Sequence, residues 1–356
     1  MLRARRVRLA AASCIAFFGC IGSESPRVVA ASPFPAVFVA VSVAELEGTQ
    51  DDPIGRVAGL AFMDGQIVVA DRFQSNLKVF ASDGRRLRAI GRPGDGPGEF
   101  RRPVSVTLAG DELVVVDDRR ASMIFFDRTG TYGRTVALPG LAHGPAVRLG
   151  RRSQFAIPFS LRTAGDYGPT ALFAVDTTGA IVDTLGRIRP PGNPMEGSAL
   201  YLRAAASDSV LAWTVNTSNE VHFTSLGTGR TWSARVAAAN YRPPQWPERP
   251  LGVGDSALQW LRSQTWVAGI HALDAERFIV RFSTGGEGRL GLHSHYYAVV
   301  SASGETLAVT EPTDVEIVAA ENGRAFGITM DDDGDVSLTT YSLDGVMVGV
   351  APEPGG

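Results

Sequence analysis

Two histidines, His293 and His295, have the type and spacing that most directly suggest chemistry. In an extended strand, side chains two residues apart point to the same face. The pair could therefore supply two ligands to a divalent metal, or an acid and a base. The surrounding segment 292–297 also fits a polar strand face with aromatic neighbours, and His271 is isolated in sequence. We expect no obligatory cofactor, and a divalent metal at these histidines is the one exception that the sequence admits.

A second candidate site is the segment 239–262, which is rich in proline and aromatic residues. Aromatic and arginine side chains are favoured at binding hot spots, and long loops on a rigid scaffold often carry function. The alternative is a loop that packs against the side of the domain and covers an edge. The ligand-binding candidates in this segment are Tyr241, Arg242, Trp246, Arg249 and Trp260.

Carboxylates occur in two patterns. The cluster Asp331–Asp335 could bind calcium, but no Glu follows at the distance of an EF-hand and Asp-Gly is a common hairpin turn, so we interpret it as a solvated turn. Asp71 and Asp117 each end a run of β-branched residues, which predicts carboxylates that accept local backbone N–H bonds. The loop Gly94–Gly98 is not followed by a helix pattern, so it is interpreted as a connection rather than a phosphate loop.

The overall charge argues against nucleic acid as a partner. The chain has 34 basic and 37 acidic residues, and four of the arginines lie within the first eight residues. Without them the net charge is about −7, which is a poor footprint for phosphate neutralisation. No G-x-S-x-G motif is present, so a Ser/His/Asp triad cannot be assigned.

Residues 1–20 have the features of an export signal. Four arginines precede an uncharged apolar run from Leu9 to Phe18, which is too short to span a bilayer. The end of this run, Phe17–Cys20, resembles the lipobox of bacterial lipoproteins, which would make Cys20 the lipidated residue. The alternative is ordinary cleavage after Val29-Ala30-Ala31. We expect residues 21–35 to be a tether, and Ile21 after the cysteine favours the outer membrane, facing the periplasm.

An internal repeat predicts the fold. The run from Gln66 to Asp71, followed by a second run and a Gly84 hairpin, recurs from Glu112 to Asp117 with a Gly130 hairpin, 46 residues later. Further hairpin glycines at 179, 227, 304 and 345 give six units, with one interval lengthened by about 30 residues. Small sheets of short strands can bury both of their faces when they are arranged radially around a common axis. The sequence therefore predicts an all-β, six-bladed β-propeller.

The ends of the domain can also be predicted. We assign residues 36–356 to a single propeller domain. The alternating segment Val37–Leu46 is a candidate closing strand beside the last blade, residues 315–350. One helical signal appears, at Asp255–Leu261, which begins with a capping residue.

The first two units also resemble a known group of proteins. The residues Gly91–Phe100, Arg102-Pro103 and the Val-Val-x-Asp strand ends make the stretch from Pro53 to Val136 similar to the NHL-repeat and TolB-like six-bladed propellers of bacteria. The resemblance implies the fold. Those families include ligand sensors, scaffolds, lactonases and lyases, so it does not select one activity.

These observations favour binding over catalysis. We expect an exported, lipid-anchored module in the cell envelope that binds a protein, peptide or glycan. The alternative is a metal-dependent, lactonase-like hydrolase or a lyase with its site at the central channel. Convergence of charged and histidine side chains from several blades on the channel would favour the enzyme.

Overall fold

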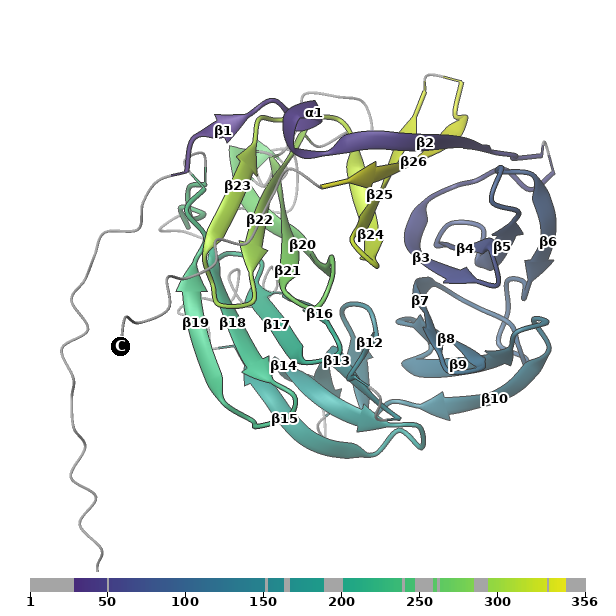
Figure 1. Cartoon of the computed structure of the whole chain (residues 1–356). Helices are drawn as coiled ribbons and strands as arrows, with labels where there is room; N and C mark the ends of the chain where they lie inside the picture. Colours follow the sequence, from purple (N-terminus) through teal and green to yellow (C-terminus); the bar gives the residue numbers. More distant parts are fainter. Residues whose placement is uncertain are drawn as a thin grey trace, which may run out of the picture.

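The computed structural model describes residues 29–49, 51–150, 153–162, 167–188, 201–238, 241–246, 259–260, 263–284, 294–331 and 333–343. These residues form six antiparallel sheets that follow one another around a central axis (Figure 1). The protein is a six-bladed β-propeller, as the repeat predicted. Within this part of the chain, no helix is long and apolar enough to cross a membrane.

Each blade is a meander whose first strand lies nearest the axis. Blade 3 differs in that its inner position is formed by two short strands, which both pair with the next long strand. Blade 1 contains β3 (Val57–Met63), β4 (Gln66–Asp71), β5 (Asn76–Phe80) and β6 (Arg86–Ile90). Blade 2 contains β7 (Pro103–Ala109), β8 (Glu112–Asp117), β9 (Ser122–Asp127) and β10 (Tyr132–Ala137). Blade 3 contains β11 (Gly140–Ala142), β12 (Val147–Arg148), β13 (Gln154–Arg162), β14 (Tyr167–Asp176) and β15 (Ile181–Arg187).

The second half of the ring continues this order. Blade 4 contains β16 (Leu202–Ala206), β17 (Val210–Val215), β18 (Glu220–Ser225) and β19 (Thr231–Arg235). Blade 5 contains β20 (Thr265–Ala272), β21 (Arg277–Thr284), β22 (Ser294–Ser301) and β23 (Thr306–Thr310). Blade 6 contains β24 (Glu316–Glu321), β25 (Arg324–Met330) and β26 (Val336–Ser342), and its outer strand comes from the N-terminus.

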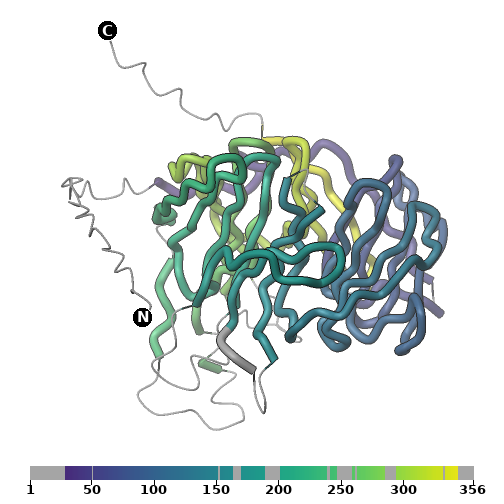
Figure 2. Tube along the Cα trace, turned by 90° about the horizontal axis from the view of Figure 1, so that it is seen from below, coloured from purple at the N-terminus to yellow at the C-terminus, as the bar shows by residue number. Residues whose placement is uncertain are grey.

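The N-terminal segment closes the ring. Strand β2 (Val39–Leu46) pairs antiparallel with β26, so the closing strand predicted at Val37–Leu46 is confirmed. Before it, β1 (Ala31–Ser32) pairs in parallel with β23 of blade 5, and helix α1 (Phe34–Val37) follows. In both views the purple N-terminal segment lies against the green and yellow C-terminal blades (Figures 1 and 2). The folded domain thus extends back into the end of the predicted tether, because residues 31–35 lie on the propeller.

Four of the six hairpin glycines that mark the repeat have a shared structural cause, whereas a Cβ at Gly227 would meet nothing within 4 Å and Gly345 lies outside the described residues. Gly130 has a φ of 89°, a left-handed conformation that L side chains rarely adopt, and a Cβ there would lie 2.7 Å from Ile90 of the preceding blade. Other outer hairpins meet the outer strand of the blade before them in the same way. The corresponding pairs are Gly84 with Glu45, Gly179 with Ala137 and Gly304 with Ala234. The repeat interval therefore records a contact between blades as well as a turn.

Apolar side chains fill the spaces between neighbouring blades. The second strands of blades 1 and 2 are nearly continuous runs of buried residues, such as Ile67–Ala70 and Leu113–Val116. Such runs are expected for a sheet that is covered on both faces. This packing holds the six inner strands around the axis and so positions their polar side chains.

Candidate functional site

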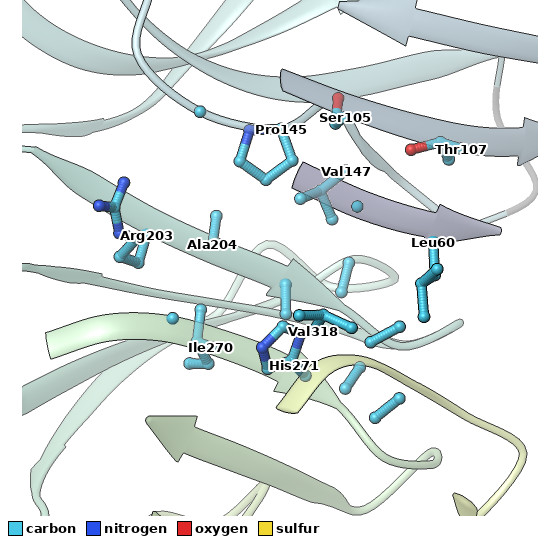
Figure 3. A pocket seen from close by; sticks show the side chains of 18 of the residues that line it. Leu60, Ser105, Thr107, Pro145, Val147, Arg203, Ala204, Ile270, His271 and Val318 are labelled. Carbon is cyan, nitrogen blue, oxygen red and sulfur yellow. The ribbon is translucent and has the colours of Figure 1, made fainter. Parts of the chain in front are cut away.

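The inner strands surround a cavity of about 750 Å³, which we call the central cavity. Residues from all six blades line it, and Figure 3 shows side chains such as Leu60, Ser105, Pro145, Arg203 and His271 around this space. Its volume is in the range of pockets that hold small molecules. A site at this position is assembled from strands that are far apart in the sequence.

Charged groups in the central cavity are separated along the inner strands. Near the beginnings of these strands the lining contains Arg56, Arg203 and Glu316. The inner strands all run in the same direction along the axis, so the two ends of the cavity can be compared. More arginines lie at the end formed by the strand beginnings, and more carboxylates lie at the other end. The charged residues near the strand ends are Asp208, Asp274, Glu321 and Arg148.

Arg203, on β16, is the least neutralised of these groups. It is half-buried, and its Nε is buried without a hydrogen-bond partner among the residues that the structure describes. Its guanidinium carbon lies 5.8 Å from the centre of the Tyr201 ring, a weak cation–π contact. Burial, and then the positive charge of Arg281, lowers the pKa of Arg203 to about 10. The group remains a cation at neutral pH, and its surroundings disfavour that charge.

Arg281 and Glu316 form an ion pair beside Arg203. The Nη1 of Arg281 lies 2.5 Å from Glu316 Oε1, and it also donates to the carbonyl of Ile317 at 3.1 Å. The Nε of Arg281 is buried without a partner in the described part of the chain. Burial acts to raise the pKa of Glu316, but the charges of Arg281 and His295 outweigh it, so the pKa is lowered overall. Glu316 is therefore ionised and neutralises one arginine.

His271, on β20, adds a neutral polar group to the same place. Burial lowers the pKa of His271 to about 3, and the charge of Arg281 acts in the same direction against the opposite effect of Glu316. Its Nε2 is buried without a partner among the described residues. Arg203, His271, Arg281 and Glu316 are called the arginine–histidine cluster below. His271 is isolated in the sequence, because its neighbours in the cluster come from other strands.

The pKa of His271 leads to a prediction about pH. Below the ordinary histidine pKa of about 6.5 the unfolded chain binds a proton that the folded chain does not, so stability falls as the pH drops from that value toward 3. We expect this group to remove about 1–2 kcal/mol of unfolding free energy between pH 7 and pH 5. Urea unfolding of the wild type and of His271→Gln at both pH values measures the difference. Equal losses in the two proteins would contradict the assignment.

The recurring aspartates have a structural role, as predicted. Asp71 is fully buried and accepts hydrogen bonds from the backbone N–H groups of Gly55 (2.7 Å), Arg56, Phe73 and Gln74. Asp117 accepts hydrogen bonds from the backbone N–H groups of Arg101 (2.6 Å), Arg102 and Arg120. Each carboxylate therefore ties the chain that enters the inner strand to the end of the second strand.

The insertion candidates lie in different surroundings. Tyr241 is 9% exposed and packs in the core, with its ring 5.4 Å from that of Phe282, so it is not part of an exposed aromatic surface. Arg242 is exposed, and Arg249 lies outside the described residues. The half-buried rings of Trp246 and Trp260 are 5.1 Å apart.

Both of these tryptophans also contact Trp266, on the inner strand β20 of blade 5, at 6.3 and 6.0 Å. Trp260 and Gln259 are helical, within the range of the predicted helix. The described parts of the insertion therefore pack over the beginning of β20, and a binding role for this segment stays a prediction.

The histidine pair is only partly described. His295 is 6% exposed on β22, and its Nδ1 is 2.7 Å from the Oγ of Ser283 on the neighbouring strand. His293 lies outside the described residues. Within the described ranges, no three His, Cys, Asp or Glu side chains form a group that could hold a metal. The metal site at His293 and His295 stays a prediction.

The acidic cluster of blade 6 is a turn in its described residues. The Oδ1 of Asp331 accepts hydrogen bonds from the N–H groups of Asp333 (3.0 Å) and Asp335 (2.8 Å), between β25 and β26. Asp332 lies outside the described residues. This geometry is that of an Asx-type turn, as the sequence interpretation expected.

Comparisons with known proteins agree with this architecture. A family model described as a 6-bladed beta-propeller (DUF5128) matches residues 31–151. A search of curated proteins finds no match. Among solved structures, a protein from Bacteroides fragilis that is described as exported is similar with a TM-score of 0.60 and 11% identity, over 87% of this chain and 96% of that one. A member of the duf4221 family from Bacteroides vulgatus has a TM-score of 0.59 and 10% identity, over 86% and 97% of the two chains.

Proposed function

We propose that this protein is an exported binding module and that the central cavity is its ligand site. The observation that carries the proposal is that Arg203, which is half-buried and has no ion-pair partner among the described residues, lines a cavity of about 750 Å³ together with His271. A partly buried charge is unfavourable without an opposite charge or hydrogen-bond acceptors. A ligand in the cavity with matching acceptors would supply them.

The sequence predicts a protein, peptide or glycan as the ligand, and the central cavity limits which part of such a ligand can bind. A peptide or glycan fits if one of its polar ends enters the cavity. A protein partner would insert a loop. The Trp246 and Trp260 rings lie over β20, the strand that also carries His271. The described part of the insertion thus stands near the cavity wall and can contribute contacts beside it.

Catalysis is the second candidate, because charged and histidine side chains from blades 4, 5 and 6 do converge on the channel. Efficient general acid–base groups have pKa values near the working pH. The pKa of His271, at about 3, and the lowered pKa of Glu316 make both groups weak bases. The electrostatics of the cluster therefore favour binding over proton transfer. If the wild type hydrolyses members of a panel of lactones and both His271→Gln and Glu316→Gln lose this activity, the result would favour the enzymatic alternative.

The cellular context of the proposal is the envelope. Export is supported by the signal-like residues 1–20, and a lipid at Cys20 would hold the propeller at the outer membrane, facing the periplasm. The domain begins near Val29, so only a short segment would separate the lipid from the folded disc. Detergent-phase partitioning of the full chain, retained in the wild type and lost in Cys20→Ser, tests the anchor.

The ligand site is tested by a screen that is not biased by charge. In ligand-observed NMR with a library of neutral, acidic and basic fragments, we expect hits whose signals are lost in Ala268→Phe. Ala268 is half-buried, lines the cavity and lies beside Gly269 and the cluster, so a larger side chain there reduces the space. Val41→Phe, on the exposed face of β2, is the control. Hits that are unaffected by Ala268→Phe would contradict the proposal.

A further inference from the structure

The charge balance of the arginine–histidine cluster is the starting point. Among the described residues, Glu316 is ion-paired with Arg281, whereas Arg203 has no ion-pair partner. A half-buried cation without a counter-charge is unfavourable, because it has lost part of its water without gaining an opposite charge. In the described part of the chain, Arg203 is therefore an unbalanced positive charge on the wall of the central cavity.

Further arginines lie beside the central cavity. Burial is the largest cause that lowers the pKa of Arg72, followed by the charge of Arg102, with Asp118 acting in the opposite direction. The carboxylate of Asp118 lies within ion-pair distance of both Arg72 and Arg102. Arg72 lines both the central cavity and a second cleft, of about 690 Å³, between blades 1 and 2. Arginine side chains therefore line both spaces, and Asp118 neutralises part of their charge.

The donors in the cluster suit an oxyanion. Arginine presents planar N–H groups that match carboxylate and phosphate oxygens, and these charge-assisted bonds are stronger than neutral ones. Arg203 and Arg281 line the central cavity from two adjacent blades, and of these two only Arg281 has an ion-pair partner among the described residues. His271, which is neutral above pH 3, places no additional charge there and can bond to a neutral part of the same ligand.

We infer that the central cavity binds a small molecule through an anionic carboxylate or phosphate group that contacts Arg203. This inference rests on the proposed function and specifies the ligand class. The carboxylates of Asp208 and Glu321 at the far end of the cavity orient such a ligand, because they repel its anionic group toward the arginines.

The test uses succinate, inorganic phosphate and succinamide as probes. Isothermal titration of the mature protein is performed in low-salt buffer that contains no other oxyanion. We expect succinate or phosphate to bind with a dissociation constant at or below about 1 mM, and succinamide, the neutral isostere, to give no heat. Binding by one anion only identifies which oxyanion the site prefers.

Three variants separate binding from structure. Arg203→Met should weaken anion binding about 10- to 100-fold, which corresponds to the loss of a charge-assisted hydrogen bond. Arg203→Lys should retain part of the affinity. Arg235→Met, on the exposed outer strand of the same blade, should bind like the wild type. In anion-free buffer, Arg203→Met should melt at the same or a higher temperature than the wild type, because an unpaired buried charge is removed.

The outcomes distinguish this inference from the proposed function. Unchanged anion affinity in Arg203→Met, with or without a lower melting temperature, would overturn the role of Arg203. If neither anion binds while neutral fragments still respond to Ala268→Phe, the cavity is a ligand site but the anionic class is wrong. If no fragment responds either, the proposed function itself fails.

Discussion

Replacing Asp71 with alanine is expected to lower the unfolding free energy by about 3–5 kcal/mol, which is typical of breaking a buried ion pair. Asp71 is fully buried and receives four backbone N–H bonds, and its Oδ2 lies 3.2 Å from the Nζ of the equally buried Lys78. Without this carboxylate, Lys78 keeps Asp52 as its one ionic partner among the described residues. The N–H groups of Gly55 and Arg56 lose their acceptor.

Urea unfolding of Asp71→Ala measures this loss, with Asp83→Ala as the control. Asp83 is an exposed hairpin residue whose carboxylate accepts one backbone bond, from Arg85 at 3.1 Å, so its change should be below about 1 kcal/mol. The double variant Asp71→Ala/Lys78→Met should be less destabilised than the sum of the single changes. A loss of less than 1 kcal/mol in Asp71→Ala would show that the network is not important for stability.

The second large effect is expected at the closure of the ring, from Phe38→Ala. Phe38 is 0% exposed, and its ring centre lies 4.8 Å from that of Phe34, 5.6 Å from Tyr297 in blade 5 and 6.3 Å from Tyr341 in blade 6. Truncation of a buried phenylalanine to alanine costs about 3–5 kcal/mol. Because this ring joins the N-terminal segment to two blades, the change should also expose the unpaired edge of β26.

Thermal unfolding and limited proteolysis monitor this closure. Phe38→Ala should melt at a lower temperature and be cut near residues 29–46 before the rest of the domain. Val41→Ala, in strand β2 just after Phe38, should behave like the wild type, since its side chain is 55% exposed. Equal protease resistance in the two variants would argue against a closing role for this segment.

The sequence was sufficient to predict the fold because the repeat is local. Gly84 and Gly130 stand at equivalent outer hairpins, and Asp71 and Asp117 at equivalent strand ends, so a spacing of 46 residues reports the blade directly. The closing strand β2 was recognisable by its alternation and confirmed by its pairing with β26. These features depend on short stretches of chain or on the repetition of one contact.

The arginine–histidine cluster could not be predicted in this way. Arg203, His271, Arg281 and Glu316 lie on four strands of three blades and share no motif, so only the closed ring brings them together. A comparison of the residues at equivalent positions of the predicted inner strands could have identified Arg203, His271 and Glu316. The sequence predicts Tyr241 as an exposed aromatic residue of the insertion, because it lies in a proline-rich segment. In the structure its ring is buried in the core beside Phe282.

The most direct test of the ligand site is a crystal structure of the protein soaked with the fragment library. We expect fragments to occupy the central cavity and to contact Arg203 or His271 more often than any other surface, and we expect Ala268→Phe crystals to lose this density. Fragments bound elsewhere, with an empty cavity in both proteins, would contradict the assignment of the central cavity as the ligand site.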